Sequence, residues 1–441
     1  EPCDFSWNGN DNTNQIVPDG IYSYEIKSKD RAGNINAQAL ITNIIYSGEK
    51  PATNIFISGS RYFSPGTDSE LSTIKFDIQI PVPAANSGNK LSQWNVSIVG
   101  TDGKIYRTYE GDEKTLPPTE IVFDGKDNNN ARIPEGKYQA AVSARYLNGY
   151  EPAIIKSPEF ILDVTKPSAQ IAVSDKIFGA GTKDKVTISM LITQKVYATV
   201  PAWKGQIINE KDSSVVKEFD FGEFPPESIA WNGFSSAGTL AHDGKYKFQL
   251  SATDLAGNKG VIISEDSFEL NTKTAKVLLS ATDVAFSPNG NKVKDTISFK
   301  PVLKDIDAIA SYEFNILDSK GVAVKSIVDS KVIPSNFVWD GKGNDGIICP
   351  NGTYSALLNV VSANGSTASV PSAKFVLDTV APKVVAKTPW SIFSPDKDGN
   401  QDVIPISISE CSTENLWTAE VKNSKGVVVK KYTWKGKIRS A

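Results

Sequence analysis

The stretch WDGKGNDGIICPNGTY, residues 339–354, gathers acidic and amide side chains, a cysteine and several glycines around a turn. Taken alone, it has the composition of a metal or catalytic loop. Three other stretches share its outline: WNGNDNTNQIVPDGIY at 7–22, FDGKDNNNARIPEGKY at 123–138 and WNGFSSAGTLAHDGKY at 231–246. Each opens with an aromatic residue and Asx-Gly, and each closes 15 residues later on the Tyr of a Gly-x-Tyr. The chain is therefore a repeat, and this stretch has to be judged beside its copies.

The copies start 116, 108 and 108 residues apart, and two further motifs keep the same phase. The motif that opens a repeat reads FSPGTDSELSTIKFDI from Phe63, FGAGTKDKVTISMLI from Phe178, FSPNGNKVKDTISFKP from Phe286 and FSPDKDGNQDVIPISI from Phe393. The motif that ends one reads DVTKP from Asp163, NTKTA from Asn271 and DTVAP from Asp378. The predicted domains are a C-terminal half repeat at 1–50, whole repeats at 51–166, 167–274 and 275–381, and an N-terminal half repeat at 382–441.

The residues after each Gly-x-Tyr alternate between apolar and polar, as Tyr246, Phe248 and Leu250 do, and this indicates a half-buried strand. YEFNILDSKGVAVKSI, residues 312–327, is typical of a hairpin with an Asp-Ser-Lys-Gly turn. No segment shows a helical period with caps. We therefore expect an all-β protein of tandem Ig-like β-sandwich domains, about 108–116 residues and about seven strands each, in an elongated array.

Three roles inside the sandwich follow from the positions that residues hold in the repeat. The Tyr of each Gly-x-Tyr is expected to form a tyrosine corner, with its hydroxyl bonded to nearby backbone. Trp7, Trp231 and Trp339 hold one repeat position before a strand, so burial in the core is expected. Cys349 replaces Val or Ile of the sister copies and is expected to be a small apolar filler.

Composition excludes several functional classes. The net charge of −3 and the scattered lysines argue against nucleic acid as a partner. No apolar run reaches the ~18–20 residues of a membrane span. His242 is the single histidine, which argues against His-based catalysis and multi-His metal sites. The cysteines, Cys3, Cys349 and Cys411, show neither a disulfide framework nor a zinc spacing. The chain is predicted not to be an enzyme, and its start at Glu1 is typical of a mature form or an excised piece.

The motifs FSPNGNKVKDTISF, VWDGKGNDG with PNGTY, and FVLDTVAPK resemble the Ig-like repeat related to the C-terminal domain of the flagellar hook-capping protein. The resemblance covers the whole chain, although FGAGTKD and Phe123 depart from the pattern. Such repeats recur in large exported envelope and surface proteins of bacteria. The resemblance implies a structural or adhesive spacer outside the cytoplasm, in the periplasm, at the outer membrane or on the cell surface. Its partners would be neighbouring domains of a longer chain.

A second function stays open, a carbohydrate- or protein-binding module that depends on calcium or not. A glycan platform would need tryptophans on a solvent-exposed face. The sequon Asn364-Gly365-Ser366 is no argument for glycosylation, since the resemblance is to bacterial proteins.

The candidate calcium loop is DKDGNQD, residues 396–402, which places Asp396, Asp398, Asn400 and Asp402 at alternate positions. It is not an EF-hand, because its Gly is misplaced and no Glu follows at the twelfth position. A polar turn that leads into a strand explains the same residues. No other cofactor is expected.

Asp340 and Asp345 of the opening stretch could form a second oxygen cage. The third copy, however, has no acid before Asp243 while its Trp and Tyr stay in register. A folding role is therefore favoured for this loop.

Overall fold

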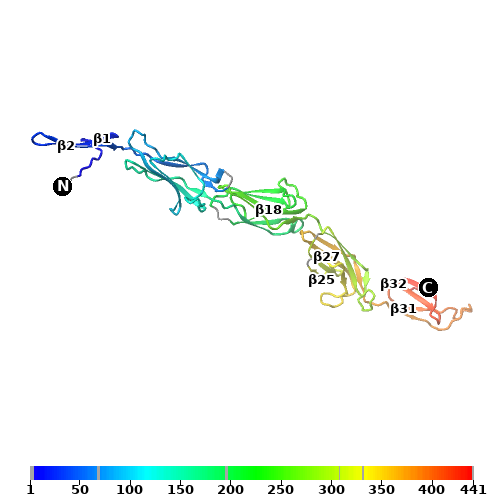
Figure 1. Ribbon diagram of the computed structural model, residues 1–441. Helices are drawn as coiled ribbons and strands as arrows, with labels where there is room; N and C mark the ends of the chain where they lie inside the picture. Colours follow the sequence, from blue (N-terminus) through cyan, green and yellow to red (C-terminus); the bar gives the residue numbers. More distant parts are fainter. Residues whose placement is uncertain (1–3, 67–69, 194–196, 307, 330–331, 440–441) are drawn as a thin grey trace. The chain divides into compact units, whose positions relative to one another are not determined.

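The computed structural model describes residues 4–66, 70–193, 197–306, 308–329 and 332–439, and Cys3 lies outside them. The chain divides into two compact units, residues 1–272 and 273–441. Among the described residues, the single helical element is a 3-10 turn at Glu70–Ser72, and every other element is a strand. The all-β prediction is confirmed (Figure 1). The described residues contain no helix that is long and apolar enough to cross a membrane.

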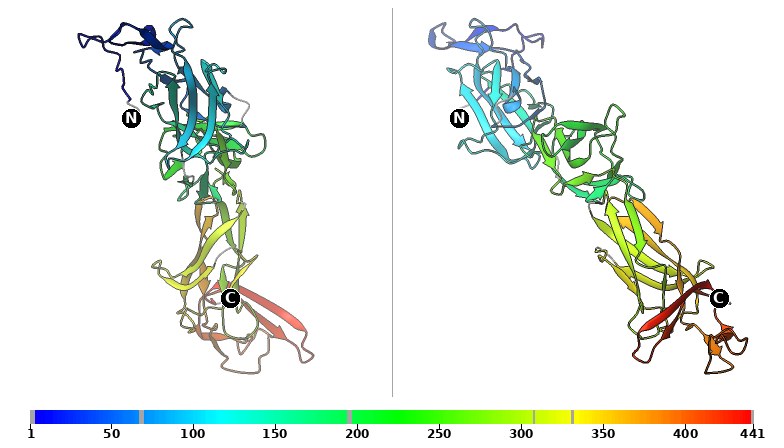
Figure 2. Two further views of the ribbon diagram at one scale, coloured as in Figure 1. Left: turned by 60° about the vertical axis from the view of Figure 1, so that its left-hand side comes forward. Right: turned by 90° about the vertical axis from the view of Figure 1, so that its right-hand side faces the viewer.

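Three β-sandwiches follow one another along the chain, and each consists of a three-stranded and a six-stranded sheet (Figures 1 and 2). The first contains β3 (Asn54–Ser58), β4 (Tyr62–Phe63), β5 (Ile74–Gln79), β6 (Leu91–Gly100), β7 (Ile105–Asp112), β8 (Glu120–Phe123), β9 (Gly136–Tyr146), β10 (Ile155–Lys156) and β11 (Phe160–Leu162). Its sheets have the orders β3-β5-β8 and β4-β11-β9-β6-β7, with β10 beside β9.

The second sandwich contains β12 (Ala169–Val173), β13 (Ile177–Phe178), β14 (Val186–Ile192), β15 (Trp203–Asn209), β16 (Val215–Gly222), β17 (Ser228–Trp231), β18 (Gly244–Thr253), β19 (Lys259–Ile263) and β20 (Phe268–Leu270). The third contains β21 (Lys276–Ala281), β22 (Ala285–Phe286), β23 (Ile297–Lys304), β24 (Ile309–Leu317), β25 (Ala323–Asp329), β26 (Phe337–Trp339), β27 (Gly352–Ser362), β28 (Thr367–Pro371) and β29 (Phe375–Leu377). Both repeat the strand order of the first. The predicted hairpin at 312–327 is confirmed as β24 and β25.

The described part of each sandwich has nine strands, more than the seven expected. Among the extra elements are two-residue strands, which are too short to show an alternating pattern. One of these carries the Phe of the opening motif and pairs in parallel with the last strand, so that Phe286 lies opposite Leu377. This pairing joins the motifs that open and close a repeat.

The core lies between the two sheets of each sandwich. In β9, β18 and β27 alternate residues are buried, as the period of two predicts. Phe123, Trp231 and Trp339 are at most 2% exposed. The centroids of the Phe286 and Trp339 rings lie 5.3 Å apart, so that the opening motif covers the aromatic residue of the later loop.

The segments at the chain ends form two-stranded sheets. β1 (Gly20–Lys29) pairs with β2 (Ile35–Tyr46), β30 (Val384–Lys387) with β31 (Ser407–Cys411), and β32 (Glu414–Lys422) with β33 (Val428–Gly436). Trp7 is 45% exposed and Phe393 is 46% exposed. The expected burial of Trp7 is wrong: in the second and third sandwiches the equivalent Trp packs against the Phe of the opening motif, Phe178 on Trp231 and Phe286 on Trp339.

Candidate functional site

The aromatic-Asx-Gly loop has the same turn conformation in all four copies. The residue seven places after the aromatic has a positive φ in every copy: Asn14 63°, Asn130 62°, Gly238 75° and Gly346 76°. Asn and Gly are the residues that adopt this conformation most readily. The backbone bonds recur as well, with Asp127 N–H donating to Ala131 O at 2.8 Å and Gly343 N–H donating to Ile347 O at 2.9 Å. The turn therefore does not depend on which polar side chains it carries.

The acids of this loop accept hydrogen bonds from its own backbone. Asp127 Oδ1 accepts the N–H groups of Asn129 and Ala131 at 2.8 and 2.9 Å. Asp345 Oδ1 accepts the N–H of Ile347 at 2.9 Å. Asp340 likewise accepts the N–H of the residue two places on at 3.1 Å. These are Asx turns, in which a side-chain oxygen accepts the backbone N–H groups of the turn. The acids of the opening stretch therefore stabilise the turn itself.

The aromatic ends of the loop are tied to nearby backbone. Trp231 Nε1 donates to Phe234 O at 2.9 Å, and Trp339 Nε1 donates to Lys342 O at 2.8 Å. Each Tyr hydroxyl donates to the carbonyl four residues earlier, Tyr22 to Pro18 and Tyr138 to Pro134 at 2.6 Å, Tyr246 to His242 at 2.5 Å and Tyr354 to Pro350 at 2.6 Å. The tyrosine-corner prediction is confirmed in all four copies.

The Gly of Asx-Gly packs closely against the Pro of the opening motif. Gly341 has φ +82°, and a Cβ added there would lie 2.7 Å from Cγ of Pro288. At Gly125 the same atom would lie 2.5 Å from Cγ of Pro65. A side chain is therefore excluded both by backbone conformation and by the Pro of Phe-Ser-Pro.

Neither His242 nor Cys349 has the surroundings of a catalytic group. His242 is exposed, and its backbone carbonyl accepts the bond from Tyr246. Cys349 is 9% exposed within the third core, and burial raises the pKa of its thiol. A raised pKa disfavours the reactive thiolate. The prediction that Cys349 is an apolar filler is confirmed.

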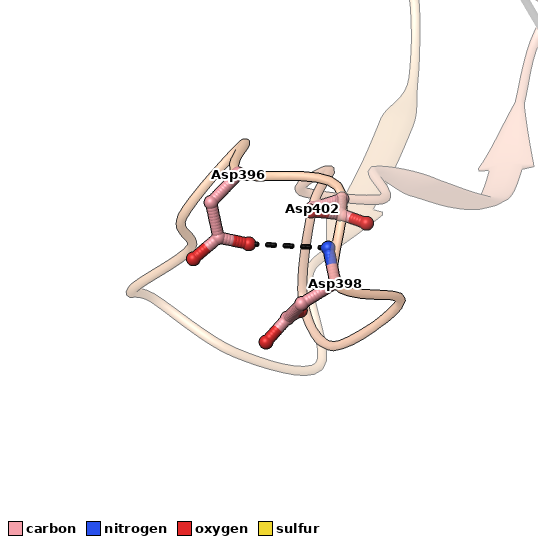
Figure 3. A group of neighbouring side chains, drawn as sticks. All are labelled: Asp396, Asp398 and Asp402. Carbon is pink, nitrogen blue, oxygen red and sulfur yellow. Dashed lines mark hydrogen bonds between the residues drawn. The ribbon is translucent and has the colours of Figure 1, made fainter.

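The structure brings together three of the four residues predicted to bind calcium. One carboxylate oxygen each from Asp396, Asp398 and Asp402 lies within 4.8 Å of the others (Figure 3). Asp396 and Asp398 are exposed and Asp402 is half-buried. Asn400 lies beside them as a donor, since its backbone N–H and its Nδ2 reach the Asp398 carboxylate at 2.7 and 3.4 Å. Across the described part of the chain, this is the one such group of acidic, His or Cys side chains.

The last Asp of this loop shapes its backbone. Asp402 accepts the N–H groups of Lys397 and Gly399 at 2.6 and 3.0 Å. In the third sandwich, Asp295 accepts the equivalent donors, Gly290 at 3.0 Å and Lys292 at 2.7 Å. That sister loop carries Asn in place of the first two acids. The fold of the loop therefore requires its last Asp, whereas the two exposed acids are additional.

A set of asparagines in the turn after the Gly-x-Tyr strand is not predicted from the sequence motifs. Their side-chain amides donate to carbonyls of the segment that enters the same sandwich: Asn148 to Ser47 O at 3.2 Å and Glu49 O at 3.0 Å, Asn258 to Asp163 O at 3.0 Å, and Asn364 to Lys273 O at 2.7 Å. Asn364 is the first residue of the triplet Asn364-Gly365-Ser366 that matches a glycosylation sequon. Each of these turns contains an Asn, but its position shifts: Asn148 and Asn364 lie just before the turn Gly, whereas Asn258 lies just after it, so the repeat register alone does not reveal the set.

No family model and no curated protein matches the chain. Among solved structures, it is similar to a tetra-tandem repeat in the extending region of a large adhesion protein, with 16% identity, 83% of each chain covered and a TM-score of 0.26. It is also similar to part of a 1.5-MDa bacterial ice-binding adhesin, with 14% identity over 75% of this chain and 100% of that one and a TM-score of 0.32. For a Ca²⁺-stabilized adhesin of an Antarctic bacterium, the identity is 12%, the coverage 81% and 82%, and the TM-score 0.29. These values are too low to carry a function across, and the strands themselves establish a chain of tandem Ig-like β-sandwiches.

Proposed function

We propose that the chain is a non-catalytic structural or adhesive spacer of a bacterial cell-envelope or surface protein. Its modules would be Ig-like repeats of the kind related to the hook-capping protein, with the domain limits predicted from the sequence. The observation that carries the proposal is the aromatic-Asx-Gly loop, which keeps one backbone conformation in four copies while its acids change. A ligand site repeated for function would keep its ligand atoms, whereas this loop keeps its turn and its aromatic ends.

The segments between sandwiches support a spacer. They are only a few residues long, and Pro167 lies at the start of the second sandwich, where its ring limits the backbone. In this proposal the partners are neighbouring domains of a longer chain, and the protein acts outside the cytoplasm by holding those domains apart.

The alternative, a glycan-binding module, requires exposed aromatic faces. Trp94, Trp203, Trp231 and Trp339 are at most 4% exposed and cannot stack on a sugar. The remaining candidates lie in the end segments, where Trp7 is exposed and Tyr432 stacks on Trp434 at 5.8 Å.

A glycan array probed with the full chain tests the proposal. We expect no saturable binding. Saturable binding that Trp7→Ala or Trp434→Ala abolishes, in a variant whose melting profile remains that of the parent chain, would replace the spacer by a binding module. Binding that neither variant changes would also count against a pure spacer.

A second proposal concerns calcium at Asp396, Asp398, Asn400 and Asp402. It is favoured by the three carboxylates whose oxygens lie within 4.8 Å, an arrangement in which like charges repel unless a cation lies among them. Calcium takes such oxygen ligands, including the side-chain oxygen of Asn. The ion would stiffen the loop between β30 and β31.

Isothermal titration with CaCl₂ and the full chain tests this second proposal. Asp398→Asn should abolish the binding heat, whereas Asn291→Ala, at the same place in the sister loop, should leave it unchanged. A wild-type chain that gives no heat, or a heat that Asp398→Asn does not alter, would leave the loop a polar turn. The spacer proposal does not depend on this result.

A further inference from the structure

A buried polar cluster joins the first and second sandwiches. Ser64, Asp163 and Asn258 are 1%, 1% and 4% exposed. The Ser64 hydroxyl donates to Asn258 Oδ1 at 2.7 Å, and Asn258 Nδ2 donates to Asp163 O at 3.0 Å. One Asn side chain of the second sandwich thus contacts both the body of the first sandwich and the segment that leaves it.

The Asn258 side chain is held in place from within its own sandwich. Asp254 opens the turn and accepts the backbone N–H and Nδ2 of Asn258, each at 2.9 Å. A second contact crosses the junction, since the N–H of Ala198 donates to Asp163 Oδ2 at 2.6 Å. Buried polar groups that are satisfied in only one arrangement select that arrangement, because any other leaves them without partners.

A contact of the same kind, made from a neighbouring position of the turn, occurs where other segments enter a sandwich. Asn148 and Asn364 use their side-chain amides on backbone carbonyls, as Asn258 does. The acceptor differs in place, since Asp163 opens the motif DVTKP whereas Lys273 is the third residue of NTKTA. Because each acceptor is a backbone carbonyl, the contact does not depend on the linker side chain.

We propose that the turn after the Gly-x-Tyr strand is a docking site for the segment that enters each sandwich, and that Asn258 is the positioning residue that fixes the first sandwich against the second. The site fits an extended segment that presents a backbone carbonyl, and at this junction it also takes a serine hydroxyl from the preceding sandwich. The inference rests on the proposed spacer and deepens it, since a spacer with fixed joints keeps its length.

Replacing Asn258 removes both bonds at once. In Asn258→Ala the Asp163 carbonyl loses this donor and the Ser64 hydroxyl loses this acceptor, in surroundings that exclude water. Separating the sandwiches would let water reach both groups, so the joint should open rather than the sandwiches unfold.

Pulsed electron-spin distance measurements on the full chain test the proposal. Spin labels go on Lys75→Cys in β5 and Asp220→Cys in β16, both exposed positions, after Cys3, Cys349 and Cys411 are replaced by Ser, Val and Ser. The parent chain should give one narrow distance distribution. Asn258→Ala should broaden and shift it.

Two further variants keep the test decisive. Ser64→Ala removes the bond to Asn258 from the other side, leaves the turn of the second sandwich intact, and should also broaden the distribution. Asn34→Ala is the matched control. Asn34 makes the same two bonds to Asp30, at 2.8 and 3.0 Å, but is exposed and, within the described part of the chain, donates to no linker carbonyl.

Parent-like distributions in both Asn258→Ala and Ser64→Ala would overturn the docking site. A broad distribution in the parent chain would overturn it too, but would leave the sandwiches as modules of a flexible spacer. The glycan array decides the spacer itself, so the two failures are distinguishable.

Discussion

Gly341→Ala tests whether the aromatic-Asx-Gly loop is a folding device. Gly341 has φ +82°, and the new Cβ would lie 2.7 Å from Cγ of Pro288, a ring that cannot swing away. A residue with a Cβ costs about 1–2 kcal/mol in the left-handed region, and overpacking adds about 1–3 kcal/mol. The free energy of unfolding of the third sandwich should therefore fall by about 2–5 kcal/mol.

Gly233→Ala in the second sandwich separates the two contributions. Gly233 has φ +86°, but its nearest neighbour is a methyl group of Leu270 at 3.0 Å, because this repeat has Ala180 in place of Pro. Only the cost of the backbone conformation, about 1–2 kcal/mol, is expected there. Pro288→Ala should recover part of the loss in Gly341→Ala, since the two residues are in contact.

Hydrogen exchange read by mass spectrometry is the assay, because peptides from each sandwich report separately. Each 1.4 kcal/mol lost accelerates exchange through global opening roughly tenfold. Equal losses in Gly341→Ala and Gly233→Ala, or no recovery with Pro288→Ala, would refute the role given to the contact between the two motifs.

Three more predictions concern the cores and the first junction. Tyr354→Phe removes the 2.6 Å hydrogen bond to Pro350 O and should lower the free energy of unfolding, measured in urea, by about 0.5–1.5 kcal/mol. An unchanged free energy of unfolding would show that the corner does not stabilise the sandwich. Trp231→Phe should lower the free energy of unfolding of the second sandwich by about 2–4 kcal/mol, because the indole volume and its hydrogen bond to Phe234 O are lost. The variant should still fold, since the first sandwich has Phe123 at the same position in its core. Burial raises the pKa of Asp254, so the charged form disfavours folding, and stability should rise as the pH falls through that raised pKa toward about 3.9. Asp254→Asn should remove that part of the rise in a pH series of melting temperatures, and an unchanged profile would contradict it.

The repeat and its strands could be predicted from the sequence because four copies keep the same anchors in phase. A Tyr after Gly at one repeat position is enough to predict the corner, since the bond is local, to the carbonyl four residues earlier. A folding role for the loop of the opening stretch could also be predicted, because the third copy lacks its acids and still forms the turn.

Two features lay beyond sequence patterns for physical reasons. The Asn258 contact joins residues 95 positions apart, and no local period records a partner at that distance. Trp7 is exposed although the motif around it matches those of buried Trp231 and Trp339, because burial in those two copies comes from contact with Phe178 and Phe286, which lie far from the Trp in sequence.

Stretching single molecules of the full chain tests the central claim, that whole Ig-like repeats are the mechanical modules of a spacer. A repeat of 108 residues spans at most about 39 nm when extended, so each unfolding event should lengthen the chain by roughly 35 nm. We expect three such events, one for each whole sandwich. A single cooperative rupture, or steps much shorter than this, would contradict it.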